Sequence, residues 1–465
     1  MAETGTAQRK TVKKTVDQWR IEADGHEKAG RLEEAESLLA KIIEAKPNYH
    51  PAIHQAAIVS WKRKRPLEAL ARFDRAMHLA PNMSLYHRNV CEVLRAQGRL
   101  DDALRHGLRA VELAPDDAGG HYNLGVIYYD RLEIDKAMAA TRRSLEIDPK
   151  QASGHFELAE ALLLTGQFEE GWREYEWRFD LPHAPPLLPP NDRPLWDGKP
   201  MPNSTLMLIG DQGFGDTIQF CRFIPQVAKI CPNIIMACSS EMRPVVIQQP
   251  GITRYYDRWQ NMPVFDAYCS LSGLPRLFNT NLKNIPAQKP YVKADEAKIA
   301  QWRKRLDALV PEAYRRIGLV WAGRPTHGND FNRSMTLQKL GALTRLDKIA
   351  FVSLQMGPAQ SEIGRYFGAA PLINIGAEIQ DFTDTMGILA GLDRLVAVDT
   401  GVAHLAGAMG VPTSILLPYA PDWRWLLKRT DSPWYPSITL HRQDKPGQWD
   451  SAVAKALELL HAEQG

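Results

Sequence analysis

The sequence predicts an all-helical N-terminal part followed by an α/β part, on three observations. Proline recurs at intervals of 34 residues in the first third of the chain, at Pro47, Pro81, Pro115 and Pro149. A segment with eight prolines, residues 181–203, then interrupts regular structure. Beyond it, short apolar runs alternate with helical stretches, which is typical of parallel sheets with crossover helices. We therefore predict a helical superhelix followed by two α/β lobes.

Length, charge and cysteine content fit a cytoplasmic multidomain protein. The 465 residues, 44% of them apolar, suffice for two or three hydrophobic cores. A net charge of +3 gives no reason to expect nucleic acid or an anionic membrane as a partner. No run approaches the roughly 18 apolar residues of a membrane span, and the N-terminus lacks the apolar core of a signal peptide. Five cysteines without a C-x-x-C pair indicate neither a zinc site nor a disulfide framework and favour a reducing cytosol.

The proline period defines a repeat of two helices. Each proline closes a helix that it cannot continue, and an alanine stands twelve residues before each proline. A side chain this small lets two helices approach closely. These alanines are Ala35, Ala69, Ala103 and Ala137. The pattern resembles the tetratricopeptide repeat (TPR), with full units at about residues 16–49, 50–83, 84–117 and 118–151.

A fifth unit begins near Ala152 and departs from the repeat in its second helix. Gly171 replaces the alanine there, and the run from Gly166 to Arg178 is rich in aromatic residues. A terminal repeat has to cover the last apolar face, so we expect these aromatic residues to pack against the next domain. The superhelix is thus predicted over residues 16–180, after a flexible N-terminus of residues 1–15.

Two asparagines are candidates for holding a protein partner on the concave face of the superhelix. Asn89 and Asn123 share one register of the first helix with Gln55 and Glu157, and this register is predicted to line the concavity. Because an asparagine side chain both donates and accepts hydrogen bonds, a ladder of them can hold the backbone of an extended peptide. Two solvated surface amides are the alternative interpretation, which stays open.

The proline-rich segment is predicted to be an extended connector over residues 181–203, with Trp196 and Gly198 docking on the domain after it. Two Rossmann-like lobes come next, over residues 204–292 and 293–465. The first contains a predicted helix over residues 217–230 between strands at 205–209 and 233–238. The second contains predicted strands at 316–322, 351–354, 395–398 and 413–418.

A glycine-rich turn from Gly210 to Asp216 follows the first predicted strand. The third glycine of a dinucleotide fingerprint would fall on Ile218, and no acidic residue ends the next strand, so we expect no nicotinamide or flavin cofactor. The turn instead supplies the Asp216 carboxylate at the start of a helix, at the sheet edge where ligands bind. Gly213 and Gly215 let the backbone approach a bound group. Asp216 either caps this helix or meets the ligand, and both interpretations stay open.

A second cluster, Asp399-Thr-Gly-Val-Ala-His404, runs from the end of a predicted strand into a helix. The N-terminus of that helix would direct unpaired N–H groups at a phosphate, with the Thr400 hydroxyl and the His404 imidazole as further donors. Arg333 and Ser334 follow the first strand of the same lobe and are predicted to meet the same anion. A purely structural histidine inside the helix is the alternative.

Several strings in this order resemble one family. They are DQGFGDTIQFCRFIP, GLVWAGRPTHGNDFNRS, FVSLQMG, AVDTGVAHLAGAMGVP and PDWRWLLKRTDSPWYP. They are similar to bacterial TPR glycosyltransferases with a heptosyltransferase-like catalytic half, and the resemblance covers nearly the whole chain. It implies a GT-B fold and an inverting, metal-independent transfer of a sugar from a nucleotide-sugar donor bound between the lobes. The sequence contains no Asp-x-Asp triplet of the kind that holds a divalent ion, so we expect neither a metal nor a cofactor.

The resemblance also implies roles for individual residues. Asp216 matches the general base that deprotonates the acceptor hydroxyl. Thr400, Gly401 and His404 match the loop that holds the donor phosphate, and Asp399 is expected to brace that loop. The other residues expected at the donor are Gly213, Gly215, Arg333, Ser334 and Asp422.

A repeat array fused to such a transferase implies that the acceptor is a polypeptide held by the superhelix, because enzymes of similar architecture modify proteins, some of them flagellins. The resemblance thus leads us to expect transfer to a Ser or Thr hydroxyl. Two alternatives stay open, a glycan or lipopolysaccharide acceptor and a non-catalytic adaptor with a degenerate transferase half. Fold analogy fixes neither the sugar nor the acceptor.

Overall fold

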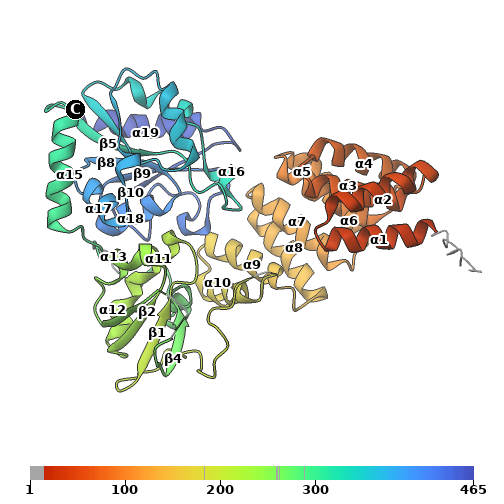
Figure 1. Cartoon of the computed structure of the whole chain (residues 1–465), viewed down its shortest axis with the longest axis horizontal. Coiled ribbons are helices and arrows are strands. Elements are labelled where there is room, and N and C mark those ends of the chain that lie inside the picture. The colour runs from red at the N-terminus through yellow and green to blue at the C-terminus, as the bar shows by residue number, and fades with distance from the viewer. Residues whose placement is uncertain (1–14, 183, 258–259, 261, 287–288, 465) are drawn as a thin grey trace, which may run out of the picture. The chain divides into compact units, whose positions relative to one another are not determined.

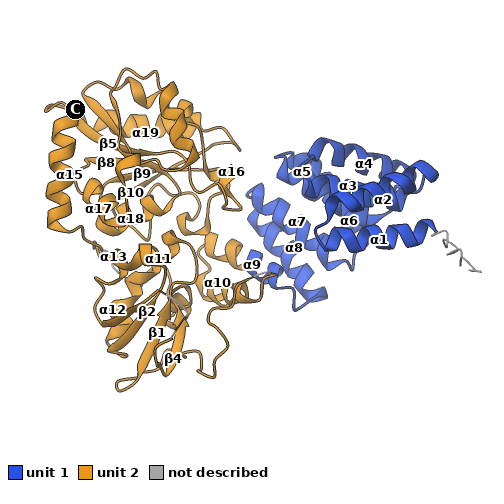
Figure 2. Cartoon of the chain, in the orientation of Figure 1, with its two compact units in different colours: residues 1–157 blue, residues 158–465 orange. Residues whose placement is uncertain are grey.

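The structure is a computed structural model that describes residues 15–182, 184–257, 260, 262–286 and 289–464. It divides into two compact units, residues 1–157 and 158–465 (Figure 2). The division falls inside a helix, so the fifth helix pair belongs for the most part to the second unit.

The described part of the first unit consists of helix pairs, as the proline period predicts (Figure 1). First helices begin every 34 residues, and each second helix ends before its proline. The helices are α1 Val16–Lys28, α2 Leu32–Ala45, α3 His50–Lys62, α4 Pro66–Leu79, α5 Ser84–Ala96, α6 Leu100–Leu113, α7 Ala118–Asp130 and α8 Ile134–Ile147. A fifth pair comes next as α9 Ala152–Leu164 and α10 Phe168–Tyr175, extended by the 3₁₀ turn η1 Glu176–Asp180.

Small residues let the paired helices approach closely. The four repeat alanines, at positions 35, 69, 103 and 137, are all buried. On the opposing helix of the fourth pair, a Cβ at Gly125 would collide with the Thr141 hydroxyl and lie 3.4 Å from the carbonyl oxygen of Ala137. The alanine and glycine positions therefore set the distance between the helices.

Replacing Gly125 by alanine is expected to destabilise the first unit by about 1–2 kcal/mol, because the collision costs more than the roughly 1 kcal/mol gained in helix propensity. Gly25→Ala is the matched control, since a Cβ at this other helical glycine would meet nothing within 4 Å. The control variant is expected to gain up to about 1 kcal/mol. Urea unfolding followed by far-UV circular dichroism measures both changes, and equal stabilisation by the two substitutions would contradict the packing argument.

The fifth helix pair packs against the α/β region of the second unit, as its aromatic residues predict. Because Gly171 has no side chain, Leu163 of α9 can pack against it. A Cβ at position 171 would lie only 2.8 Å from the Leu163 side chain. The Trp172 ring meets those of Trp423 and Trp434 at 5.3 and 6.5 Å. In η1, the Arg178 guanidinium donates to the hydroxyls of Ser270 and Ser272 at 3.0 and 2.7 Å.

The described residues of the connector, 181–203, form no regular helix or strand. Trp196 is buried, and its backbone N–H donates to the carbonyl of Tyr268 at 2.8 Å. Gly198 has a positive φ of 87° and lies against Leu277. Both residues thus dock the connector on the first sheet region, as predicted.

The first sheet has four parallel strands in the order β3-β2-β1-β4. Its strands are β1 Thr205–Ile209, β2 Asn233–Ala237, β3 Ile252–Tyr256 and β4 Ala267–Ser270, with helices α11 Phe214–Phe220, α12 Ile224–Ala228, α13 Arg243–Val246 and α14 Leu274–Leu277. The prediction of one helix over residues 217–230 is wrong, because the Asp216 carboxylate accepts the Gly213 N–H and starts α11 at Phe214. A 3₁₀ turn at Cys221–Phe223 then separates α11 from α12.

The second sheet has six parallel strands in the order β10-β9-β8-β5-β6-β7. They are β5 Arg315–Val320, β6 Ile349–Ser353, β7 Leu372–Asn374, β8 Arg394–Val398, β9 Thr413–Leu417 and β10 Ile438–Arg442. The α-helices of this region are α15 Glu296–Leu309, α16 Asp330–Arg333, α17 Phe382–Leu389, α18 Gly401–Met409 and α19 Asp450–Ala462. All predicted strands are present, whereas β3, β4, β7 and β10 were not predicted from the sequence.

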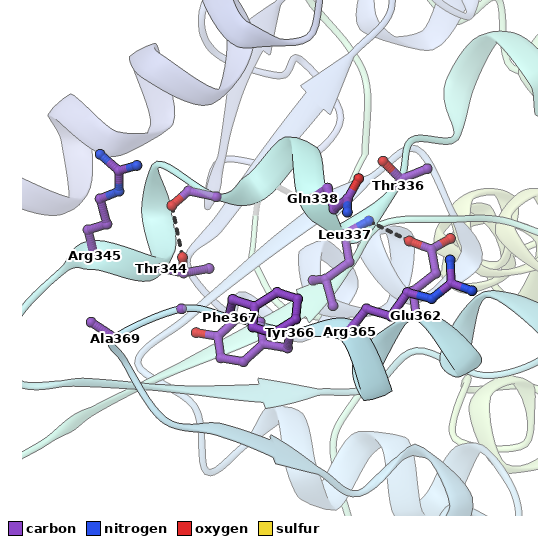
Figure 3. Close-up of a pocket in the computed structure, with 12 residues that line it drawn as sticks. Thr336, Leu337, Gln338, Thr344, Arg345, Glu362, Arg365, Tyr366, Phe367 and Ala369 are labelled. Atoms are coloured by element: carbon purple, nitrogen blue, oxygen red, sulfur yellow. Dashed lines mark hydrogen bonds between the residues drawn. The ribbon is translucent and has the colours of Figure 1, made fainter.

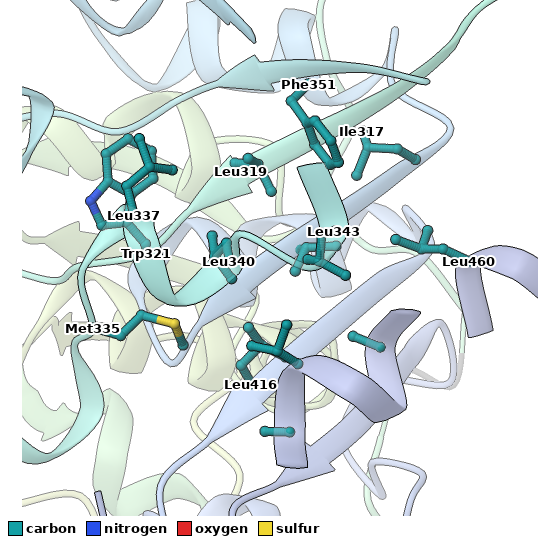
Figure 4. Packing of buried hydrophobic residues seen from close by; sticks show 14 of the residues in the cluster. Ile317, Leu319, Trp321, Met335, Leu337, Leu340, Leu343, Phe351, Leu416 and Leu460 are labelled. Carbon is teal, nitrogen blue, oxygen red and sulfur yellow. The ribbon is translucent and has the colours of Figure 1, made fainter. Parts of the chain in front are cut away.

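A large apolar core covers one face of the second sheet (Figure 4). Ile317, Leu319 and Phe351 of the strands pack there with Leu343 and with Leu460 of α19. Figure 1 shows α17 and α18 on the other side of the sheet. Because both faces are covered, the strands are nearly continuous apolar runs, and the polar residues at their carboxyl ends gather at the sheet edge.

Candidate functional site

Asp216 lies in the first turn of α11, at the carboxyl edge of the first sheet. Its Oδ2 accepts the backbone N–H of Gly213 at 3.0 Å, which is a capping interaction. Its Oδ1 accepts a hydrogen bond from the guanidinium of Arg424, which follows β9 of the second sheet. The carboxylate therefore caps its helix and also faces the other sheet region. The capping interpretation is confirmed, whereas a contact with a ligand stays a prediction.

Arg424 is the residue that sequence reasoning missed. It is buried in the 3₁₀ turn η9 Trp423–Trp425, and it donates two hydrogen bonds to the Asp422 carboxylate at 2.9 Å each. Its Nε donates to the side chain of Gln219 at 2.6 Å. Burial lowers the pKa of Arg424, but the carboxylates of Asp422 and Asp216 outweigh burial and raise this pKa well above its ordinary value. Arg424 thus carries a fixed positive charge that joins the two sheet regions.

Asp422 holds Arg424 in place. Both of its oxygens accept from the guanidinium, and Oδ1 also accepts the backbone N–H of Arg424. The expectation that Asp422 contacts the donor stays a prediction, and in the structure its hydrogen bonds go to Arg424. Trp423 and Trp425 beside it are fully buried and pack with other rings, so they belong to the core.

Thr400 and Gly401 form the start of α18, at the carboxyl edge of the second sheet. Thr400 is the residue that precedes the helix, yet its hydroxyl forms no capping bond. The hydroxyl is buried and has no hydrogen-bond partner among the described residues. A Cβ at Gly401 would lie 3.6 Å from the Cβ of Phe214 and 3.7 Å from the backbone nitrogen of Gly215. The two loops that the sequence singled out therefore meet, with the first N–H groups of α18 at the junction.

The His404 side chain lies between α18 and the Asp216 turn, and its expected donation to a phosphate stays a prediction. It is buried, with Nδ1 2.8 Å from the Tyr435 hydroxyl and Nε2 3.6 Å from Oδ1 of Asp399. The His404 ring also requires a glycine at position 215, because a Cβ there would lie 2.9 Å from the His404 Cδ2. His404 thus positions the α11 turn against α18.

Asp399 directly follows β8 and contacts His404, and its expected role in bracing the donor loop stays a prediction. Burial raises the pKa of its carboxyl, but the side chains of His404 and Trp425, together with the charge of Arg333, outweigh burial and hold the pKa below its ordinary value. Asp399 is therefore ionised under the His404 ring, which favours the orientation of that ring.

Arg333 and Ser334 end the loop that follows β5, and they play different parts. The Ser334 hydroxyl donates to the Asp330 carboxylate and accepts the N–H of Gly323, both at 2.9 Å. Ser334 therefore braces the loop, and a contact with the donor stays a prediction. Arg333 lies 3.4 Å from Asp330 and close enough to Asp399 to lower its pKa. The Arg333 guanidinium keeps donors for an anion, so its role stays a prediction.

The two asparagines in the first unit are not both free to hold a peptide backbone. The Asn89 amide lies 3.1 Å from Nε2 of His54, and the Asn123 amide donates to the carbonyl of Arg88 at 3.3 Å. Each amide thus ties its helix to the first helix of the preceding repeat. These contacts stabilise the superhelix, and peptide binding by Asn89 and Asn123 stays a prediction.

Comparison with known proteins supports the helical repeat. A TPR repeat model matches residues 92–131. The protein FlbA of Caulobacter vibrioides is 23% identical over 331 residues, which are 65% of this chain and 54% of FlbA. The chain thus spans about half the length of this curated relative. The N-terminal part of the chain described here is a TPR-like helical superhelix, and a parallel-sheet α/β region follows it.

Three solved structures are each similar to about a third of the chain. PilW, a type IV pilus biogenesis factor, is 18% identical and covers 37% of this chain and 81% of its own, with a TM-score of 0.34. PilF of Pseudomonas aeruginosa is 22% identical and covers 35% of this chain and 74% of its own, with a TM-score of 0.33. MamA of Desulfovibrio magneticus is 21% identical and covers 36% of this chain and 94% of its own, with a TM-score of 0.32.

Within the described residues, every helix is too short or too polar to cross a lipid bilayer.

Proposed function

We propose that the chain is a GT-B glycosyltransferase, which moves a sugar from a nucleotide-sugar donor to a Ser or Thr hydroxyl of a protein acceptor. Two parallel sheets with facing carboxyl edges support this proposal, because ligands of α/β folds bind at such edges. The observation that carries it is the buried Thr400 hydroxyl, which lacks a partner at the N-terminus of α18 and adjoins the Asp216 turn. A donor phosphate would satisfy both this hydroxyl and the first N–H groups of α18.

The proposed transfer follows from these positions. The acceptor hydroxyl gives its proton to Asp216 while its oxygen forms a bond to the anomeric carbon of the sugar. The bond from that carbon to the diphosphate oxygen breaks on the opposite face, which inverts the configuration. Negative charge grows on the departing diphosphate, where the N-terminus of α18 and Arg333 would stabilise it without a metal ion.

The superhelix supports a polypeptide as the acceptor, because stacked helix pairs present an extended concave surface to a partner chain. Flagellin is the acceptor to test first, given the resemblance of the sequence to flagellin-modifying enzymes. Incubation of the full chain with labelled donor and with either flagellin or lipopolysaccharide distinguishes a protein acceptor from a glycan acceptor.

Thr400→Val tests the donor site with opposite effects on stability and on binding. The isosteric valine removes a buried unsatisfied hydroxyl, so the free protein should be as stable as the parent or more so. It also removes a hydrogen bond to a charged phosphate, so the affinity for the bound nucleotide should fall about tenfold or more. Thermal shifts with UDP, GDP, ADP, dTDP and CMP identify the nucleotide, because a ligand that binds only the native state raises the melting temperature.

Thr413→Val is the matched control for this experiment. The Thr413 hydroxyl is buried but donates to the carbonyl of Val411 at 2.9 Å, and Thr413 begins β9, beyond the C-terminal end of α18. Its loss should lower the stability and leave the nucleotide shift unchanged. Equal shifts in the parent and in Thr400→Val would remove Thr400 from the donor site.

A non-catalytic adaptor is the second candidate function, and one observation favours it. Both oxygens of Asp216 and both ring nitrogens of His404 already face partners within the chain. Such a site could be purely structural. A purified chain whose melting temperature responds to none of the five nucleotides would favour the adaptor.

A further inference from the structure

A pocket of about 530 Å³ lies in the second sheet region, apart from the residues of the candidate donor site (Figure 3). One wall comes from the 3₁₀ turns η5 Leu337–Leu340 and η6 Leu343–Arg345, and the other from η7 Pro358–Arg365 and the segment directly after it. Its volume falls within the roughly 300–1,000 Å³ of ligand pockets.

Hydrogen bonds hold the two walls of this pocket together. Glu362 accepts the backbone N–H of Leu337 at 2.6 Å, and the backbone N–H of Ala370 donates to the carbonyl of Thr344 at 2.9 Å. Gly368 is required between the walls, because a Cβ there would collide with the hydroxyl of Tyr366 and with Thr344. The pocket is therefore formed before any ligand arrives, which lowers the entropic cost of binding.

The lining combines an apolar centre with a charged rim. Leu337 is part of the core at the base of the pocket, whereas the Phe367 side chain beside it is 93% exposed. Figure 3 shows the guanidinium groups of Arg345 and Arg365 at opposite ends, with Phe367 between them. Both arginine residues are exposed and line the pocket. One carboxylate, that of Glu362, lines the pocket, and one of its oxygens is engaged by Leu337.

We propose that this pocket binds an acidic peptide segment of a partner protein. An apolar side chain of the segment packs between Leu337 and Phe367, and acidic side chains on either side of it pair with Arg345 and Arg365. Arginine and aromatic residues dominate the binding energy of protein interfaces, and a guanidinium pairs with a carboxylate through two parallel hydrogen bonds. The separation of the two arginines by an apolar surface favours an extended segment over a small anion. This site requires no glycosyl transfer.

Fluorescence anisotropy of the full chain tests the proposal with a labelled Glu-Glu-Leu-Phe-Glu-Glu peptide. Lys-Lys-Leu-Phe-Lys-Lys tests the charge, and Glu-Glu-Ser-Ser-Glu-Glu tests the apolar anchor. The acidic apolar peptide should bind at least tenfold more tightly than either of the other two. Arg345→Glu, Arg365→Glu and Phe367→Ser should each weaken its binding at least fivefold, because each removes one of the three contacts.

Lys339→Glu is the matched control, since Lys339 is exposed on η5 but does not line the pocket. It should leave the affinity within about twofold, and all four variants should keep the melting temperature of the parent. Three results would overturn the proposal. The first is no binding of the acidic apolar peptide up to about 1 mM. The second is equally tight binding of the basic peptide. The third is binding that none of the three pocket substitutions weakens, because the peptide would then bind elsewhere, for example on the superhelix.

Discussion

Asp216→Asn is expected to lower the rate of sugar transfer by about 10²–10⁴-fold, the usual contribution of a general base. Asparagine keeps the size of the side chain, and its oxygen can still accept the Gly213 N–H that starts α11. It cannot take a proton from the acceptor hydroxyl. Because Arg424 retains both hydrogen bonds to Asp422, the fold should persist, and the affinity for the nucleotide should change only a few-fold. Single-turnover transfer and calorimetric nucleotide titration measure the two effects separately.

Asp295→Asn is the control that separates basicity from helix capping. Asp295 also begins a helix of the second unit, and its carboxylate accepts the N–H groups of Ala297 and Lys298. This exposed cap lies on α15 and contacts none of the candidate site residues. Its substitution should cost at most about 1 kcal/mol of stability and leave transfer intact. Full turnover by Asp216→Asn would exclude Asp216 as the base, even if donor binding at Thr400 persisted.

The sequence predicts the parts of this fold that depend on local pattern. The proline period places each first helix because every helix pair packs mainly against its immediate neighbours in the chain. The apolar runs locate the buried strands, whereas β3 was missed because none of its five residues is buried, and β7 because it has only three residues. The start of α11 was missed because its glycines indicate a turn, and the capping bond of Asp216 became visible only in the structure.

The site was predictable as two loops but not as a set of contacts. Asp216 and the Thr400 turn are each recognisable because a polar residue follows a buried strand. Arg424 pairs with a residue 208 positions earlier in the chain, and no local pattern indicates such a partner. The inward orientation of His404 depends likewise on Tyr435, 31 residues away. The position of Arg424 between Trp423 and Trp425 was the sequence signal that could have indicated its burial, although not its partner.

Arg424→Met is expected to destabilise the second unit by about 3 kcal/mol and to abolish transfer. Methionine fills much of the volume but leaves the carboxylates of Asp216 and Asp422 without their shared cation. Removing one partner of a buried ion pair costs about 3–5 kcal/mol, and the lower value applies here because the carboxylates keep side-chain exposures of 22% and 30%. Urea unfolding followed by tryptophan fluorescence measures the loss, since Trp423 and Trp425 flank the substituted residue.

A double-mutant cycle then shows whether the loss comes from the pair that joins the two sheets. In the Arg424→Met background, Asp216→Asn removes one of the stranded charges, so the second substitution should cost less than it does in the parent. A coupling of about 1–2 kcal/mol is expected for two side chains in direct contact. Additive effects would mean that Arg424 stabilises its own turn through Asp422 alone. The positioning of Asp216 would then depend on the capping bond of α11, and transfer should survive in Arg424→Lys as well as in Arg424→Met.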